Sequence, residues 1–132
     1  MRRALRCLAL AGAGATIVVA SALAAAPASA HNYPVGSTPA EGATVTVQPD
    51  VISLTTNDNL LDFGSSSAIQ VSGPSDAPLY YGDGCATVTD ATVETTAQLG
   101  APGEYTVQWQ VVSTDGHPVS GSFTFDWQPD AS

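Results

Sequence analysis

Two histidines and one aspartate carry the most specific chemistry in this 132-residue sequence. His117 follows Asp115 by two residues, and His31 follows a small-residue segment that ends at Ala30. If the chain is cut before His31, this residue carries a free amine, and the amine and ring Nδ1 chelate one ion. With Asp115 and His117 the set becomes three nitrogens and a carboxylate oxygen, which suits tetragonal Cu(II). The residues predict one Cu(II) ion per chain, provided that the two segments meet.

The stretch from Asp115 to His117 has two interpretations. If it is extended, both side chains point to the same side, and Gly116 lets the backbone bend closely around an ion. It is also a good turn sequence, because Asp and Gly favour local hydrogen bonds and unusual φ. Asp115 is either a direct ligand or a carboxylate that fixes the His117 tautomer. The placement of the only two histidines favours the metal-site hypothesis.

Residues 1–30 have the pattern of a signal peptide. Arg2, Arg3 and Arg6 form a basic start, a small-residue apolar run follows, and Ala28-Ser29-Ala30 matches an A-x-A cleavage pattern. The pattern predicts an exported protein, periplasmic or extracellular at the cell envelope, with a mature domain at 31–132. The Arg2-Arg3 pair does not decide between the general and the twin-arginine export routes.

Charge separates the two parts of the chain. All three basic side chains lie within residues 1–30, and all twelve carboxylates lie after them. Such a domain repels phosphate backbones and anionic lipid headgroups, so we expect no nucleic-acid partner. The mature part has no run long and apolar enough for a membrane span. Cations are the ligands that such a field concentrates, although a plain solubilising coat gives the same composition.

Cys85 is the only cysteine after residue 30. No intramolecular disulfide is then possible within 31–132. A free cysteine is often a small buried hydrophobe, and we expect that structural role here, with intermolecular pairing or soft metal ligation as alternatives.

Short alternating runs predict an all-β fold. The clearest contain Tyr105, Val107, Trp109 and Val111 on one face of a strand, then Phe123, Phe125 and Trp127 on the next. Shorter runs are expected at 45–47, 52–54, 68–71 and 91–99, whereas 31–42 is expected to be irregular because of its prolines and glycines. About seven strands with regular turn signals favour a Greek-key sandwich or barrel, Ig-like or cupredoxin-like.

These residues resemble the CopC family of periplasmic copper-resistance proteins. The matching pieces are His31, then Ser37-x-Pro39-Ala40-x-Gly42, Val51-x-x-Leu54, and the motif Tyr105-x-Val107-x-Trp109-x-Val111-x-Ser113-x-Asp115-Gly116-His117-Pro118-Val119-x-Gly121-x-Phe123-x-Phe125. The resemblance spans nearly all of 31–132. It implies a small cupredoxin-like domain, not an enzyme, that carries or buffers copper in copper homeostasis or resistance.

The resemblance also implies a ligand set and a partner. The ligands are the His31 amine and imidazole, Asp115 and His117, and the partner is a membrane copper importer of the CopD type. Some members place a glutamate near the end of the second strand, where this chain has the shorter Asp58. The alternative for Asp58, slightly favoured, is a loop-capping role. Thr56 replaces a usual aromatic residue, and the only methionine is Met1, so no methionine-rich Cu(I) site is expected.

Three other functions are open from the residues. A copper monooxygenase also begins at a terminal histidine, but the domain is small for a flat substrate face, and Asp115 would occupy the position that oxygen needs. A metal-free Ig-like adhesion or interaction module would use the acidic face or the strand edges. Calcium binding through Asn57, Asp58, Asn59 and Asp62 lacks the EF-hand spacing.

Overall fold

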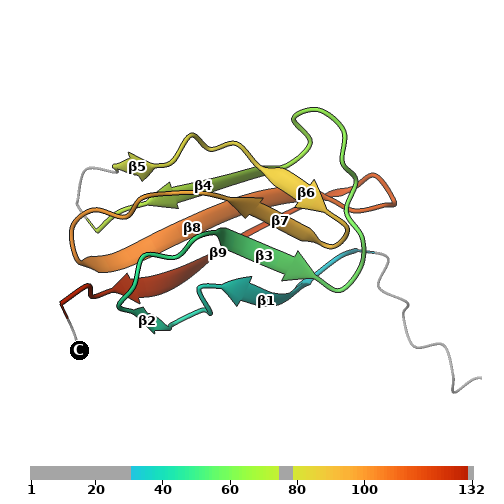
Figure 1. Ribbon diagram of the computed structural model, residues 1–132. Helices are drawn as coiled ribbons and strands as arrows, with labels where there is room; N and C mark the ends of the chain where they lie inside the picture. Colours follow the sequence, from blue (N-terminus) through green and yellow to red (C-terminus); the bar gives the residue numbers. More distant parts are fainter. Residues whose placement is uncertain (1–30, 75–78, 131–132) are drawn as a thin grey trace, which may run out of the picture.

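The computed structural model describes residues 31–74 and 79–130, and these form nine β-strands and no helix. The expected signal peptide, 1–30, lies outside the described residues. The strands form two facing sheets (Figure 1). The smaller has the order β1 (Pro34–Thr38), β3 (Ile52–Thr56), β7 (Thr92–Thr95) and β6 (Thr87–Thr89). The larger has the order β2 (Thr44–Val45), β9 (Pro118–Trp127), β8 (Gly103–Val112), β4 (Ala68–Ser72) and β5 (Tyr80–Tyr81).

The hairpin of β8 and β9 is the centre of the larger sheet. The two strands pair without a register break from Gly103 opposite Trp127 to Val112 opposite Pro118. Because side chains alternate between the faces of a strand, the apolar residues of both strands point to the same side. The hairpin therefore supplies one continuous apolar surface and ends in the turn that carries Asp115 and His117.

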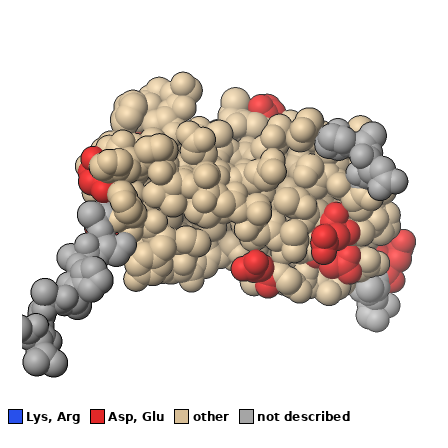
Figure 2. Space-filling view, turned by 180° about the vertical axis from the view of Figure 1, so that it is seen from behind, with Lys and Arg blue, Asp and Glu red and all other residues tan. Residues whose placement is uncertain are grey.

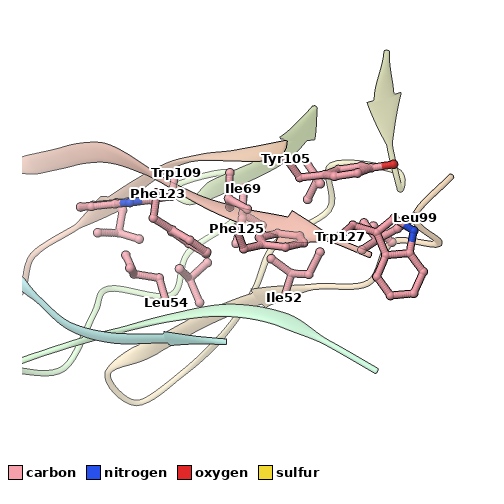
Figure 3. Packing of buried hydrophobic residues seen from close by; sticks show 14 of the residues in the cluster. Ile52, Leu54, Ile69, Leu99, Tyr105, Trp109, Phe123, Phe125 and Trp127 are labelled. Carbon is pink, nitrogen blue, oxygen red and sulfur yellow. The ribbon is translucent and has the colours of Figure 1, made fainter. Parts of the chain in front are cut away.

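The core lies between the two sheets and is dominated by this hairpin (Figure 3). Five aromatic side chains at its centre are no more than 6% exposed: Tyr105, Trp109, Phe123, Phe125 and Trp127. Ile52 and Leu54 of β3 pack against them from the smaller sheet. Burial of large apolar side chains is the main stabilising contribution to such a domain, so the hairpin is held firmly in the core.

The all-β sandwich is confirmed, with more strands than the expected seven. The additional elements are short, since β2 and β5 have two residues each. The expected strand at 91–99 is confined to Thr92–Thr95 of β7, and a turn at Asp90, whose φ is 53°, joins it to β6. Ala97 and Leu99 are buried although they lie beyond the strand.

The expectation that residues 31–42 are irregular is wrong for β1. Pro34–Thr38 pairs with β3 at the edge of the smaller sheet, with a register shift between Pro34 and Gly36. An edge strand tolerates a proline at its first residue, because the N–H that proline lacks is not needed for pairing there. The register shift leaves Val35 as the extra residue of β1, and Gly36 is paired with Thr55. Proline and glycine, which would interrupt a central strand, therefore occur here in an edge strand with a bulge.

The prediction that Cys85 is buried is also wrong, because this residue is exposed. The Asp83 carboxylate accepts the Cys85 backbone N–H at 2.9 Å. Gly82 and Gly84 flank Asp83 with φ of 76° and 71°. This local turn holds the segment on the surface, so the thiol does not reach the core.

The end of the hairpin where β8 begins, opposite the turn, is fixed by the hydroxyl of Tyr105. It donates to Ala101 O at 2.9 Å and accepts from Gly100 N at 3.0 Å. A tyrosine that bonds back to the chain four residues earlier is typical of sandwich corners. Burial, together with the neighbouring Tyr81 hydroxyl, raises the pKa of Tyr105 to about 12.

The surface carries carboxylates without basic partners. No Lys or Arg lies after Arg6, and the face in Figure 2 shows separated groups of Asp and Glu around a broad uncharged area. That face contains no blue side chain. Within the described ranges, no helix is long and apolar enough to cross a membrane.

Candidate metal centre

Five residues lie between β8 and β9, and Ser113 and His117 are joined by a backbone hydrogen bond that leaves a three-residue loop, Thr114 to Gly116. Ser113 N donates to His117 O at 3.0 Å, and Gly116 N donates to Ser113 O at 2.8 Å. Gly116 has φ of 86°, a left-handed value that glycine adopts without a Cβ clash. This geometry is common for three-residue hairpin loops. The interpretation of Asp115 to His117 as an extended segment is therefore wrong, and the turn interpretation holds.

The two oxygens of Asp115 face different partners. Oδ1 accepts the His117 backbone N–H at 3.0 Å and thereby stabilises the turn. Oδ2 lies 3.3 Å from His117 Nδ1 and 3.3 Å from His31 Nδ1. One carboxylate thus shapes the loop and also faces both imidazoles.

His31, Asp115 and His117 form the one group of three potential metal ligands within 31–74 and 79–130. One donor atom from each lies within 4.8 Å of the others. The imidazole rings meet edge to face, with centroids 5.1 Å apart and planes at 84°. The side chains of His31 and His117 are 58% and 67% exposed, and that of Asp115 is 27% exposed. The cluster is therefore open to solvent and to a partner.

His31 reaches this turn because Asn32, the next residue, is anchored in the protein. Asn32 is 5% exposed, and its backbone N–H donates to Ser113 Oγ at 3.1 Å. Its side-chain amide donates to Asp58 O at 2.6 Å and to Asn59 O at 3.1 Å. Figure 1 shows the start of the described chain and the β8–β9 turn at the same end of the sandwich. Two segments 81 residues apart are joined by one buried amide.

Thr56 and Ser113 complete this anchor. Thr56 is 3% exposed, and its Oγ1 lies 3.1 Å from Asn32 Nδ2 while donating to Asp58 O at 2.7 Å. Ser113 is fully buried. Sequence reasoning missed all three residues as parts of the site. The available signal was a polar residue directly after His31 and a serine at the end of an apolar strand.

Asp58 does not belong to the cluster. Its carboxylate accepts the Asn59 N–H at 2.7 Å within its own loop, and only its backbone carbonyl faces Asn32. The same loop contained the calcium candidates. Asn57 Oδ1 accepts the Tyr33 N–H at 2.7 Å, and the described chain contains no second group of three His, Cys, Asp or Glu side chains close enough to share a metal ion. The loop positions the chain that precedes β1.

The electrostatics of the cluster favour an ionised carboxylate. The hydrogen bond from the His117 backbone N–H lowers the pKa of Asp115, and the two imidazoles lower it further. An anionic oxygen between two imidazole nitrogens is a suitable set for a divalent transition metal, because nitrogen and carboxylate donors match Cu(II) and its neighbours.

The fold and cluster define a small β-sandwich with an open imidazole–carboxylate site at one end. The CopC domain matches residues 34–128, so the chain belongs to the CopC family. This match includes Asp115 and His117, whereas His31 lies just before it.

Sequence relatives agree with this assignment. Copper resistance protein C of Xanthomonas campestris pv. juglandis is 33% identical over 114 residues, which cover 83% of this chain and 89% of the relative. Copper resistance protein C of Pseudomonas syringae pv. tomato is 34% identical over 115 residues, covering 83% and 90%.

Two solved structures share the fold. CopC from Methylosinus trichosporium OB3b has a TM-score of 0.65 at 23% identity, covering 77% of this chain and 98% of the other. PcoC from Escherichia coli, a methionine-rich copper resistance protein, has a TM-score of 0.60 at 25% identity, covering 75% and 100%.

Proposed function

We propose that the chain from His31 onward binds one Cu(II) ion as cargo and acts as a copper carrier or buffer outside the cytoplasm. The ligands are the His31 amine and Nδ1, a carboxylate oxygen of Asp115, and His117. The observation that carries the proposal is the convergence of His31 Nδ1 and His117 Nδ1 on Asp115 Oδ2, each at 3.3 Å. The copper-resistance names of the relatives support the choice of metal.

The orientation of His31 supports a terminal chelate. The amine and Nδ1 of one histidine close a ring on the same ion, whereas Nε2 cannot. It is Nδ1 that faces Asp115. The chelate requires cleavage after Ala30, so the proposal includes export and removal of residues 1–30. Because the site is exposed, the ion can pass to another protein without unfolding of the sandwich.

The ligand chemistry favours Cu(II) over Cu(I). Soft sulfur donors select Cu(I), and the only methionine in the sequence is Met1. Cys85 is not among the residues of the cluster. A membrane copper importer of the CopD type is the proposed partner.

A copper enzyme that activates oxygen needs a free coordination position on the ion, whereas a carrier does not. In the proposed set Asp115 occupies the fourth equatorial position beside the three nitrogens, so no position in that plane is left for oxygen. We therefore propose no catalytic role. With ascorbate and oxygen, the copper-loaded protein is expected to form peroxide no faster than the same amount of copper bound to a chelator of similar affinity.

The ligand set is tested by a copper titration of three variants against a competing chelator. His117→Ala removes one nitrogen and is expected to weaken Cu(II) binding by a hundredfold or more. Asp115→Asn keeps an oxygen for the turn but removes the charge, and is expected to weaken binding about tenfold, or about 1.4 kcal/mol. Asp62→Asn, an exposed carboxylate outside the cluster, is the matched control and is expected to change nothing. Equal Cu(II) affinity of all three variants would contradict the proposed set of ligands.

A further inference from the structure

The outer edge of β9 is unpaired over its first half. β2 pairs with β9 only at Asp126 and Trp127. Gly42 N donates to Thr124 O, and Asp126 N donates to Ala43 O, both at 2.8 Å. Even-numbered residues of β9 therefore direct their backbone groups away from β8. Because this direction alternates along an antiparallel strand, Ser120 and Ser122 also present their backbone N–H and C=O outward, and no strand of the described chain pairs with them.

A groove of about 650 Å³ runs beside this edge, between β9 and β1. Trp109 and Phe123 line it from the core side. The opposite wall contains Tyr33, directly before β1, and Val35 of β1, which are 54% and 59% exposed. Exposed apolar side chains beside unsatisfied backbone groups are the features that an added strand satisfies. An occupant in extended conformation would bond to β9 and place alternate side chains in the groove.

Other edges of the sandwich are protected against such pairing. β1 begins with Pro34 and has a register shift, β6 has three residues and β5 has only two. Proline, bulges and short length are the devices by which proteins blunt a sheet edge. Between Pro118, which has no N–H, and Thr124, whose carbonyl already accepts the Gly42 N–H, residues 119–123 of β9 contain no charged side chain and show no register break. Within the described part of the chain this stretch is therefore the regular edge segment that remains open, with Ser120 and Ser122 as its outward-facing residues.

Charge decides which occupant fits. Residues 31–132 carry twelve carboxylates and no Lys or Arg, and Glu41 lies on the groove. Two copies of this chain repel each other, whereas a segment flanked by Lys or Arg is attracted. The groove also extends to Asn32, the neighbour of His31, so an occupant lies beside the proposed copper site.

We propose that this groove docks an extended, basic-flanked apolar segment of the protein that exchanges copper with this chain, by strand addition to β9. The identity of this partner rests on the proposed function, but the docking itself does not need copper. Strand addition holds the partner within reach of His31 and His117, so transfer occurs between bound proteins.

The test uses metal-free protein from His31 onward, which contains all nine described strands. The probe is a short peptide in which valine alternates with threonine between pairs of lysines. We expect saturable changes in the amide resonances of Ser120 and Ser122 and in the indole of Trp109. The same peptide with alternate amides N-methylated cannot complete the ladder, and is expected to bind at least tenfold more weakly.

Two variants separate strand addition from adhesion to an acidic surface. Ser120→Pro removes an outward N–H and is expected to weaken the lysine-flanked peptide by tenfold or more. Glu41→Lys does not alter the edge, and is expected to weaken that peptide while improving a glutamate-flanked one. Gln70→Ala, on the exposed face of β4, is the control that changes neither.

Three outcomes would overturn the docking proposal. These are no resonance change at millimolar peptide, changes confined to other residues, or changes at Ser120 and Ser122 that follow protein concentration without peptide. The last would make the edge an interface between copies. Copper titration is measured separately, so loss of copper binding with intact peptide binding would overturn the carrier function and leave the docking edge in place.

Discussion

At the scale of single residues, the groups that face the metal site lie directly beside groups that hold the backbone in place. Asp115 uses one oxygen for the turn and the other toward the histidines. His31 faces the turn while Asn32 holds the backbone beneath it. The metal ligands come from two segments that are far apart in the sequence, and hydrogen bonds between neighbouring groups bring them together. The positioning residue Asn32 is as necessary to the geometry as the ligands are.

We predict that Asn32→Ala weakens both the fold and copper binding. The substitution leaves the Asn59 carbonyl without its donor and removes one of the two donors to the Asp58 carbonyl, which keeps the Thr56 hydroxyl, and this costs roughly 1–3 kcal/mol of unfolding free energy. His31 then loses its fixed place, and Cu(II) affinity is expected to fall at least tenfold. Urea unfolding and chelator competition measure the two effects.

Asn59→Ala is the matched control for this prediction, because it keeps the backbone carbonyl that Asn32 uses. It should leave both quantities near their original values. If Asn32→Ala destabilised the fold but left copper affinity unchanged, the positioning role assigned to Asn32 would be wrong.

At the scale of elements, the β8–β9 hairpin unites core, turn and groove. Its close packing is clearest at Gly121, where an added Cβ would lie 2.7 Å from Trp109 Cζ2. A side chain of any size there displaces an indole that is 6% exposed. The hairpin therefore requires glycine at this position for space, since its φ is not in the left-handed region.

Gly121→Ala is expected to destabilise the domain by about 1–3 kcal/mol, the usual cost of overpacking. Gly36→Ala is the control, because an added Cβ there would meet nothing within 4 Å and the φ of Gly36 is ordinary. Thermal unfolding compares the two. Equal melting temperatures would show that Trp109 moves aside without cost.

The Tyr105 corner gives a pH dependence. Its pKa is about 12 in the folded chain against an ordinary value of 10.0, so between these values the unfolded state loses a proton that the folded state keeps. Stability therefore falls as pH rises through that window, by about 2–3 kcal/mol in total. Tyr105→Phe is expected to remove this fall while costing about 1–2 kcal/mol at neutral pH through its lost hydrogen bonds.

Urea unfolding at several pH values from neutral to strongly alkaline measures this effect. Tyr80→Phe, which changes a tyrosine that is 59% exposed, is the control and should keep the alkaline fall. The same alkaline slope in Tyr105→Phe and in the original protein would contradict the assignment to Tyr105.

A structural feature can be predicted from the sequence when the residues that cause it are neighbours in the chain. The period-two aromatic runs and the turn at Gly116 depend on neighbouring residues, so the hairpin and the Asp115 to His117 loop were predictable. The anchor of Asn32 joins residues 81 apart and has no local signal. Edge strand β1 was missed because Pro34 and Gly36 are read as breakers, although an edge tolerates them. Cys85 was misplaced because composition does not show the turn at Asp83.

At the scale of the whole molecule, charge is the dominant feature. The domain from residue 31 has twelve carboxylates and no Lys or Arg. Self-repulsion disfavours the compact state but keeps copies apart and attracts cations. The uncharged area in Figure 2 and the open part of the β9 edge are therefore surfaces that carry no carboxylate of their own.

We predict that sodium chloride stabilises the domain. Screening of repulsion between carboxylates raises the urea midpoint from low salt to roughly 0.5 M, where the Debye length is only a few ångström. Near pH 3 most carboxylates are protonated, and the effect is expected to shrink. A midpoint that falls with salt at neutral pH would contradict the view that unpartnered charge limits stability.

The central claim is the terminal chelate at His31, and one comparison tests it most directly. Cu(II) is titrated into protein that begins at His31 and into protein with one additional residue before it, and both are followed by electron paramagnetic resonance. We predict one tightly bound equivalent with nitrogen hyperfine structure in the first protein, and a marked loss of affinity with an altered spectrum in the second. Equal affinity and identical spectra would contradict the terminal chelate and the copper-carrier account built on it.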